Sequence, residues 1–83
     1  MVRIVCSVRD SASLLFGQPV FVAAKGQAIR SFQDEVNKGE GDLSRHPEDF
    51  ELWQLCEWDD VLGKFDGVPA LLLRAKDCVV SKE

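Results

Sequence analysis

The residues best suited to chemistry in this chain gather in one short stretch, HPEDFELWQLCEWDD, residues 46–60. It holds the only histidine, both tryptophans, one of the three cysteines and six of the fourteen acids. A histidine beside carboxylates can act as a general acid or base or as a metal ligand, so His46 with Glu48 and Asp49 is the first candidate site. No second histidine, and no serine or cysteine at a recognised motif spacing, accompanies it. We therefore expect His46 to be a surface or structural residue and the chain not to be an enzyme.

The cysteines and glycines do not form a recognised binding motif. Cys6, Cys56 and Cys78 are far apart in the sequence and make no Cys-x-x-Cys pair, whereas structural zinc sites usually show ligands paired at short spacing. The glycines fit no phosphate-binding loop, and the acids at 59–60 lack the further oxygen ligands of a calcium loop. The sequence therefore predicts no metal and no cofactor, with three reduced thiols.

Charge is distributed unevenly along the chain. The 83 residues carry 14 acids and 10 bases, a net charge of −4 at pH 7. Residues 1–38 hold five bases and three acids, residues 39–66 two bases and nine acids, and residues 67–83 three bases and two acids. A net negative charge opposes binding to phosphate, but the distribution leaves room for a positive surface outside 39–66. We expect the acidic segment to face away from any bound nucleic acid.

The chain is short enough to be one domain, residues 1–83. No apolar run approaches the ~20 residues needed to cross a membrane. Arg3 and Asp10 interrupt the N-terminal apolar residues too early for a secretory signal. We expect a cytosolic protein that is not secreted and does not contact a membrane.

Hydrophobic periodicity predicts an α+β fold in the order strand, strand, helix, strand, strand, strand. MVRIVCSV alternates and predicts a strand, and PVFVAA predicts a second. Residues 27–38 change to helical spacing, with Ile29, Phe32 and Val36 on one face. Three further strands are expected at 50–58, 64–66 and from residue 70, the first two joined by a hairpin loop. The expected architecture is one antiparallel sheet of four to five strands with a single amphipathic helix, whose apolar face packs on Phe50, Leu52 or Leu73.

Strict alternation divides the strand at 50–58 into two faces. One is predicted to hold Phe50, Leu52, Gln54, Cys56 and Trp58, and the other Glu51, Trp53, Leu55 and Glu57. Both faces carry large apolar groups, and one helix cannot cover both. An exposed apolar patch of this kind usually marks an interface, so we expect a twofold homodimer.

Three segments in this order, PVFVAAKGQAIRSFQDEVN, HPEDFELWQLCEWDD and GKFD, resemble the small nonstructural protein of gokushovirus-type phages, within the Microviridae. The resemblance covers roughly residues 14–66. The chain departs from the family at Cys56, where glycine is frequent, and at Trp58, where a smaller aromatic is usual. The resemblance implies a protein made in the cytoplasm of an infected bacterium that acts in single-stranded DNA genome synthesis or packaging, with no catalytic residues.

Two functional hypotheses follow. In the first, a non-enzymatic accessory protein contacts single-stranded DNA or the viral and host proteins of replication and packaging. Its binding residues would be Arg3, Arg9, Lys25 and Arg30, with Phe21 or Trp53 stacking on bases. Phe16 and Trp58 are further stacking candidates, although packing in the core is the favoured explanation of these aromatic residues. In the second hypothesis, favoured by the net charge, the chain is a dimeric adaptor that binds a viral or host protein through an apolar sheet face and does not touch DNA.

Overall fold

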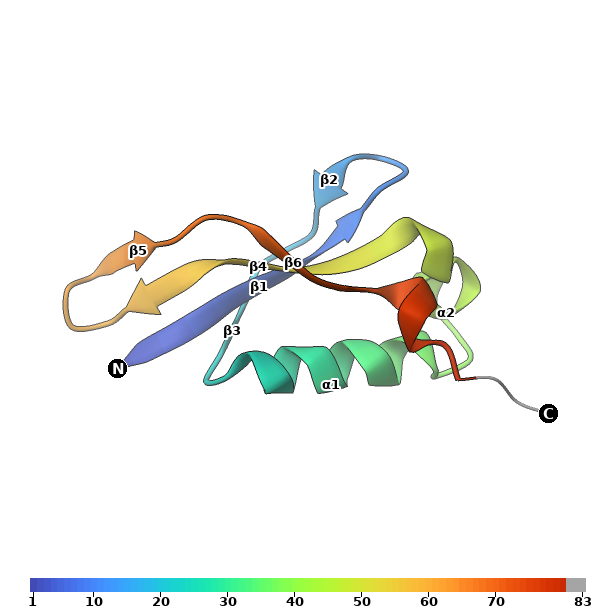
Figure 1. Ribbon diagram of the computed structural model, residues 1–83, viewed down its shortest axis with the longest axis horizontal. Coiled ribbons are helices and arrows are strands. Elements are labelled where there is room, and N and C mark those ends of the chain that lie inside the picture. The colour runs from blue at the N-terminus through green and yellow to red at the C-terminus, as the bar shows by residue number, and fades with distance from the viewer. Residues whose placement is uncertain (81–83) are drawn as a thin grey trace.

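A computed structural model describes residues 1–80 and confirms an α+β fold with one antiparallel sheet and one main helix (Figure 1). The elements in chain order are β1 (Val2–Asp10), β2 (Leu15–Phe16), β3 (Val20–Val22), α1 (Lys25–Val36), α2 (Asp42–Arg45), the 3-10 turn η1 (Pro47–Asp49), β4 (Phe50–Asp59), β5 (Lys64–Asp66), β6 (Ala70–Arg74) and the 3-10 turn η2 (Ala75–Cys78). The sheet has six strands rather than four or five. No helix within residues 1–80 is both long and apolar enough to cross a membrane.

Two long strands form the centre of the sheet. β1 and β4 are antiparallel partners from Val2 opposite Asp59 to Asp10 opposite Phe50. Each carries two short strands on its outer edge, β2 and β3 along β1, and β5 and β6 along β4. Figure 1 shows the hairpin of β4 and β5 projecting beyond the N-terminal end of α1, and the molecule measures 49 × 25 × 17 Å.

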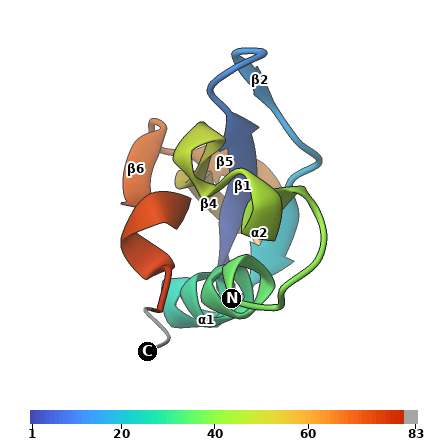
Figure 2. The ribbon, with the colours of Figure 1, turned by 90° about the vertical axis from the view of Figure 1, so that its right-hand side faces the viewer.

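The helix α1 covers one face of the sheet with the apolar stripe that its sequence predicts. Ala28, Phe32 and Val36 recur every fourth residue and are buried, and Ile29 is partly buried beside them. They pack against Cys6 of β1 and Leu52 of β4, with Phe50 and Leu73 at the margin of the same core. The turn η2, red in Figure 2, lies beside both α1 and β6 and contributes the buried residues Ala75 and Cys78.

Side-chain hydrogen bonds fix both ends of α1. At the start, the Gln27 carboxamide oxygen accepts the backbone N–H groups of Ala23 and Ala24, at 2.8 and 3.3 Å. At the end, the Asn37 amide nitrogen donates to the Cys78 carbonyl at 2.9 Å, and its oxygen accepts the Val80 N–H at 2.9 Å. The helix terminus and the C-terminal turn therefore hold each other, because one amide side chain satisfies groups from both.

Three short elements were not predicted. Residues 11–19 contain β2, which pairs with the end of β1. The segment after α1 leads directly into α2, whose Ser44 hydroxyl donates 2.8 Å bonds to the carbonyls of Glu35 and Val36. The chain then enters β4 through the 3-10 turn η1, which begins at Pro47. Elements of two to four residues depend on such tertiary contacts more than on local pattern.

A bulge in β4 changes which side chains share a face. Val5 pairs with Cys56 but Cys6 pairs with Gln54, so Leu55 is an extra residue in β4. One extra residue shifts the alternation of every position beyond it. Trp58 therefore lies on the same face as Trp53, and the predicted separation of the two tryptophans onto opposite faces is wrong.

Candidate nucleic-acid interface

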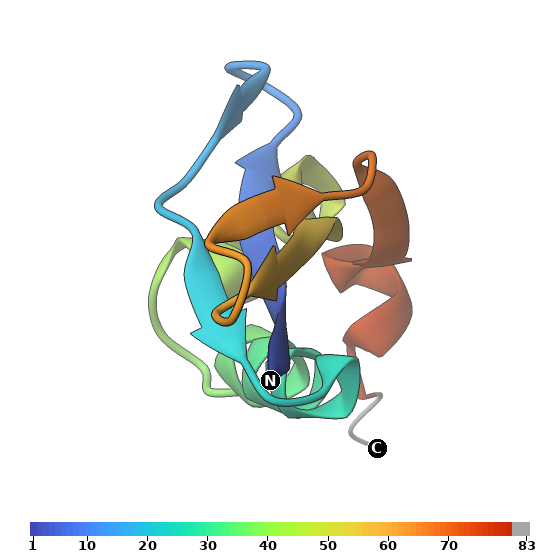
Figure 3. The same ribbon diagram turned by 90° about the vertical axis from the view of Figure 1, so that its left-hand side faces the viewer.

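The sheet face opposite α1, called the open face below, carries the aromatic side chains of the strands. Directly opposed residues of antiparallel strands point to the same face. Cys6 of β1 packs against α1, so its neighbour Val5 points to the open face. Val5 pairs with Phe21 of β3 and with Cys56 of β4. The same register places five aromatic residues on the open face: Phe16, Phe21, Trp53, Trp58 and Phe65. In Figure 3 α1 lies below the strands, and no second helix of its length covers the opposite side within residues 1–80.

Three of these rings form the β5 cluster, defined as Phe21, Trp58 and Phe65. The ring centroids of Trp58 and Phe65 are 4.8 Å apart, and the Phe21 centroid is 6.4 Å from each. Arg3 and Asp60 line the same shallow hollow as the three rings. Phe65 is 60% exposed and Phe21 47%, so ring surface remains available to a planar ligand.

The other two rings form the β2 cluster, defined as Phe16 and Trp53. Their centroids are 5.8 Å apart at an interplanar angle of 80°, an edge-to-face contact. The Arg9 guanidinium carbon lies 5.7 Å from the Phe16 centroid, within cation–π distance. The Trp53 indole N–H donates to a Glu51 carboxylate oxygen at 3.0 Å, so the polar edge of the ring is held in place.

The loop of residues 17–19, between β2 and β3, separates the two clusters. Ser7, opposite Trp53 and buried, donates a 2.7 Å hydrogen bond to the Gly17 carbonyl. Gly17 packs so closely on β1 that a Cβ there would lie 3.3 Å from the Val8 carbonyl oxygen. Arg9 is six residues after Arg3 along β1, about 20 Å away at ~3.3 Å per residue. The open face is thus an elongated surface with Arg3 and the β5 cluster at one end, and Arg9 and the β2 cluster at the other.

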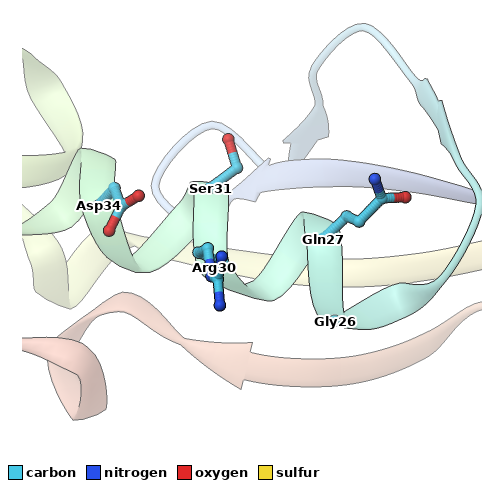
Figure 4. Close-up of a pocket in the computed structure, with 5 residues that line it drawn as sticks. All are labelled: Gly26, Gln27, Arg30, Ser31 and Asp34. Carbon is cyan, nitrogen blue, oxygen red and sulfur yellow. The ribbon is translucent and has the colours of Figure 1, made fainter.

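The structure divides the six predicted binding residues between two surfaces. Arg3, Arg9, Phe21 and Trp53 lie on the open face, whereas Lys25 and Arg30 belong to α1 on the other side of the sheet. Figure 4 shows a hollow beside Arg30 whose lining comes from α1 alone: Gly26, Gln27, Arg30, Ser31 and Asp34. It is the outer surface of one helix, and the acid one turn after Arg30 offsets its charge.

Several residues of the open face were missed. Phe65 joins it through its pairing with Trp58, and Arg74 through its pairing with Glu51. Glu51 itself belongs to the acidic segment 39–66, which was expected to face away from any bound nucleic acid, and it lies on the open face beside Arg9. Only the pairing of β4 with its neighbours reveals these placements, because β5 is too short to show an alternation of its own.

Of the histidine and the three cysteines, only Cys56 lies on the open face, and none belongs to either aromatic cluster. His46 is exposed, with its Nδ1 3.8 Å from a Glu48 carboxylate oxygen. With Asp49 these two form the one group of three metal-ligand side chains within residues 1–80, and no cysteine belongs to it. All three cysteines are free, and burial raises the pKa of the Cys6 and Cys78 thiols, which keeps them protonated.

The comparison with known families covers both clusters. The sequence profile described as phage ORF5 protein matches residues 3–78, from Arg3 on the open face to Cys78 in η2. No curated protein and no solved structure matches the chain. Because the profile spans nearly all of the 83 residues, the chain belongs to the phage ORF5 protein family.

Proposed function

We propose that this phage protein is a non-enzymatic accessory protein of a gokushovirus-type phage of the Microviridae. In this proposal it acts in the cytoplasm of the infected bacterium, in replication or packaging of a single-stranded DNA genome, and binds that DNA on the open face. The observation that carries the proposal is the gathering of five aromatic rings and three arginines on one sheet face without helix cover. Stacking of an unpaired base on an aromatic side chain is worth ~1–3 kcal/mol.

The arrangement favours a single strand over a duplex. Exposed rings can stack only on bases that are not already paired and stacked within a double helix. Non-specific duplex binding depends instead on many neutralised phosphates, and a net charge of −4 gives this chain little of that attraction. Acids farther than the Debye length of ~8 Å from the rings are screened, so the charges near the rings, among them Asp60 in the hollow of the β5 cluster, decide binding.

Tryptophan fluorescence provides the test, because both tryptophans lie on the open face. The probe is an oligothymidylate of about 12 nucleotides, within the usual site size of a single-strand-binding domain. We expect it to quench the emission with saturation, and a duplex of equal length to quench it far less. The matched control is Lys25→Ala with Arg30→Ala on α1, which removes two positive charges away from the open face. If that pair of changes weakened binding more than Arg3→Ala does, the DNA surface would be α1 instead.

A protein-interaction module is the second candidate function. Its supporting observation is apolar exposure outside the rings: Val61 and Val68, flanking β5, are 79% and 80% exposed. Exposed apolar groups that cluster on a small domain usually mark a protein interface. A protein that bound no DNA at tens of micromolar, but bound a viral or host replication protein, would favour this function over the first.

A further inference from the structure

One acid on the open face lies where a phosphate would otherwise bind arginine. Glu51 of β4 is opposite Arg9 of β1 on one side and Arg74 of β6 on the other. One carboxylate oxygen is 3.5 Å from the Arg9 Nη1, and the other is 3.7 Å from the Arg74 Nε. The Trp53 indole N–H holds the same carboxylate, which is only 17% exposed. Glu51 is therefore fixed between the two guanidinium groups.

The opposite end of the open face has no such acid. Arg3 makes no ion pair within residues 1–80, and it is exposed. The acid that shares its hollow, Asp60, is already bound to the Met1 amino group at 2.6 Å. The two ends therefore have similar rings but different electrostatics. The arginine beside the β5 cluster is available to an anion, whereas those beside the β2 cluster share a carboxylate.

We propose that Glu51 limits the affinity of the DNA site, an inference that rests on the proposed function. A carboxylate and a phosphate compete for the same guanidinium donors, because arginine binds both in the same planar geometry. With Glu51 in place, Arg3 contacts a phosphate at the β5 cluster, and the β2 cluster contributes stacking on Phe16 and Trp53. Arg9 and Arg74 orient the carboxylate and do not neutralise the DNA.

The test is Glu51→Gln, which removes the charge and keeps an oxygen that can accept the Trp53 N–H. Log affinity falls as log salt rises, and each arginine that gains a phosphate contact makes this slope more negative by ~0.7. Over the tenfold change from 1 M to 0.1 M salt, each such contact therefore adds about fivefold in affinity. We expect the variant to bind the oligothymidylate up to about 25-fold more tightly at 0.1 M salt, with a slope steeper by up to ~1.4.

The matched control is Glu57→Gln. It makes the same charge change on the same strand, but Glu57 is exposed and opposite Ile4, on the α1 side of the sheet. If Glu51→Gln gained no more affinity or slope than Glu57→Gln, while wild type bound normally, the inference would be wrong and the proposed function would stand. If neither wild type nor Glu51→Gln bound the oligothymidylate, both would be wrong.

A second comparison removes the arginines, and its first part does not depend on the folding of Glu51→Gln. In otherwise wild-type protein, Arg3→Ala should lower the salt slope by ~0.7, whereas Arg9→Ala with Arg74→Ala should leave it unchanged. In the background lacking Arg9 and Arg74, the gain from Glu51→Gln should disappear. A gain that persisted there, or a slope that fell on loss of these two arginines alone, would overturn the inference. Thermal melting of each variant establishes that it is folded.

Discussion

Phe65 is the most accessible ring of the open face, and its role can be tested at the scale of one residue. It packs on Trp58 at 4.8 Å but is 60% exposed, so its removal affects the surface more than the core. Phe65→Ala should weaken binding of the oligothymidylate by roughly five- to 150-fold, the equivalent of ~1–3 kcal/mol for one stacked base. Titration by tryptophan fluorescence measures the loss.

The control for Phe65→Ala is Val61→Ala in the same hairpin. Val61 is at least as exposed and is apolar, but it has no ring to stack on a base. Its change should leave the affinity within about twofold, since surface substitutions of this kind cost under ~0.5 kcal/mol. Equal losses for both variants would mean that the hairpin contributes apolar contact in general and not stacking.

Asp59 makes the stability of the β4–β5 hairpin depend on pH. Its carboxylate accepts the backbone N–H groups of Val61 and Leu62 at 2.9 and 3.1 Å, which holds the pKa of Asp59 below its ordinary value of 3.8. A depressed pKa means stabilisation that is complete above pH 3.8 and lost as pH falls through the lower folded value. Asp59→Ala should therefore melt below wild type at pH 7, by a margin that shrinks at pH 3.

Asp59→Asn distinguishes the hydrogen bonds from the charge. The amide oxygen can accept the same two N–H groups without titrating in this range, so the variant should melt near wild type at pH 7. Its melting temperature should also fall less than that of wild type on acidification to pH 3. Asp59→Asn with Asp60→Asn should leave oligothymidylate binding unchanged or slightly tighter. A weaker complex would show that these acids support the DNA site.

At the scale of elements, the sequence predicts what periodicity can encode. The helix stripe at Ile29, Phe32 and Val36 and the length of β4 both follow from spacing alone. The bulge at Leu55 does not, because it is a property of the pairing between β4 and β1. That single residue brings Trp58 to the face of Trp53, and with it the β5 cluster. The candidate site was therefore only partly predictable, because Arg3, Arg9, Phe21 and Trp53 were identified but Phe65, Arg74 and the surface that they share were not.

The turn from β5 to β6 depends on a glycine. Gly67 has φ of +124°, and a Cβ there would lie 3.4 Å from the Cys56 Cα, so the strain would come from the backbone more than from crowding. Gly67→Ala should lower the free energy of unfolding by about 1–3 kcal/mol. Gly63, at φ of +65° with open space around it, is the control, and Gly63→Ala should cost only ~1–2 kcal/mol. Urea denaturation that ranked Gly63→Ala as the costlier change would contradict this.

At the scale of the whole molecule, the net charge and the charge of the proposed surface differ. Nine of the fourteen acids fall within residues 39–66, yet β4, which lies entirely within that segment, is one of the two central strands. The fold leaves Arg3 on the open face and brings Glu51 beside Arg9. Composition could not predict this, because the faces of a sheet are set by pairing and not by position along the chain.

The exposed apolar surface predicts self-association of the molecule. Beyond the open-face rings, Val61, Leu62 and Val68 are all more than half exposed around β5, a large share of apolar surface for so small a domain. A twofold homodimer is the commonest way to cover such a surface. Light scattering at tens of micromolar should give twice the mass of the chain, and Val61→Lys with Val68→Lys should shift it toward the monomer. A strict monomer for wild type would contradict the prediction.

Binding of single-stranded DNA to the open face is tested most directly by titrating the oligothymidylate across a range of salt concentrations while following tryptophan emission. We predict saturable quenching and a preference for the single strand over a duplex of equal length. The slope of log affinity against log salt should be shallow, near −0.7, since one arginine contacts a phosphate. Absence of quenching at ~0.05 M salt, where electrostatic attraction is strongest, or equal affinity for the duplex, would contradict the proposed function.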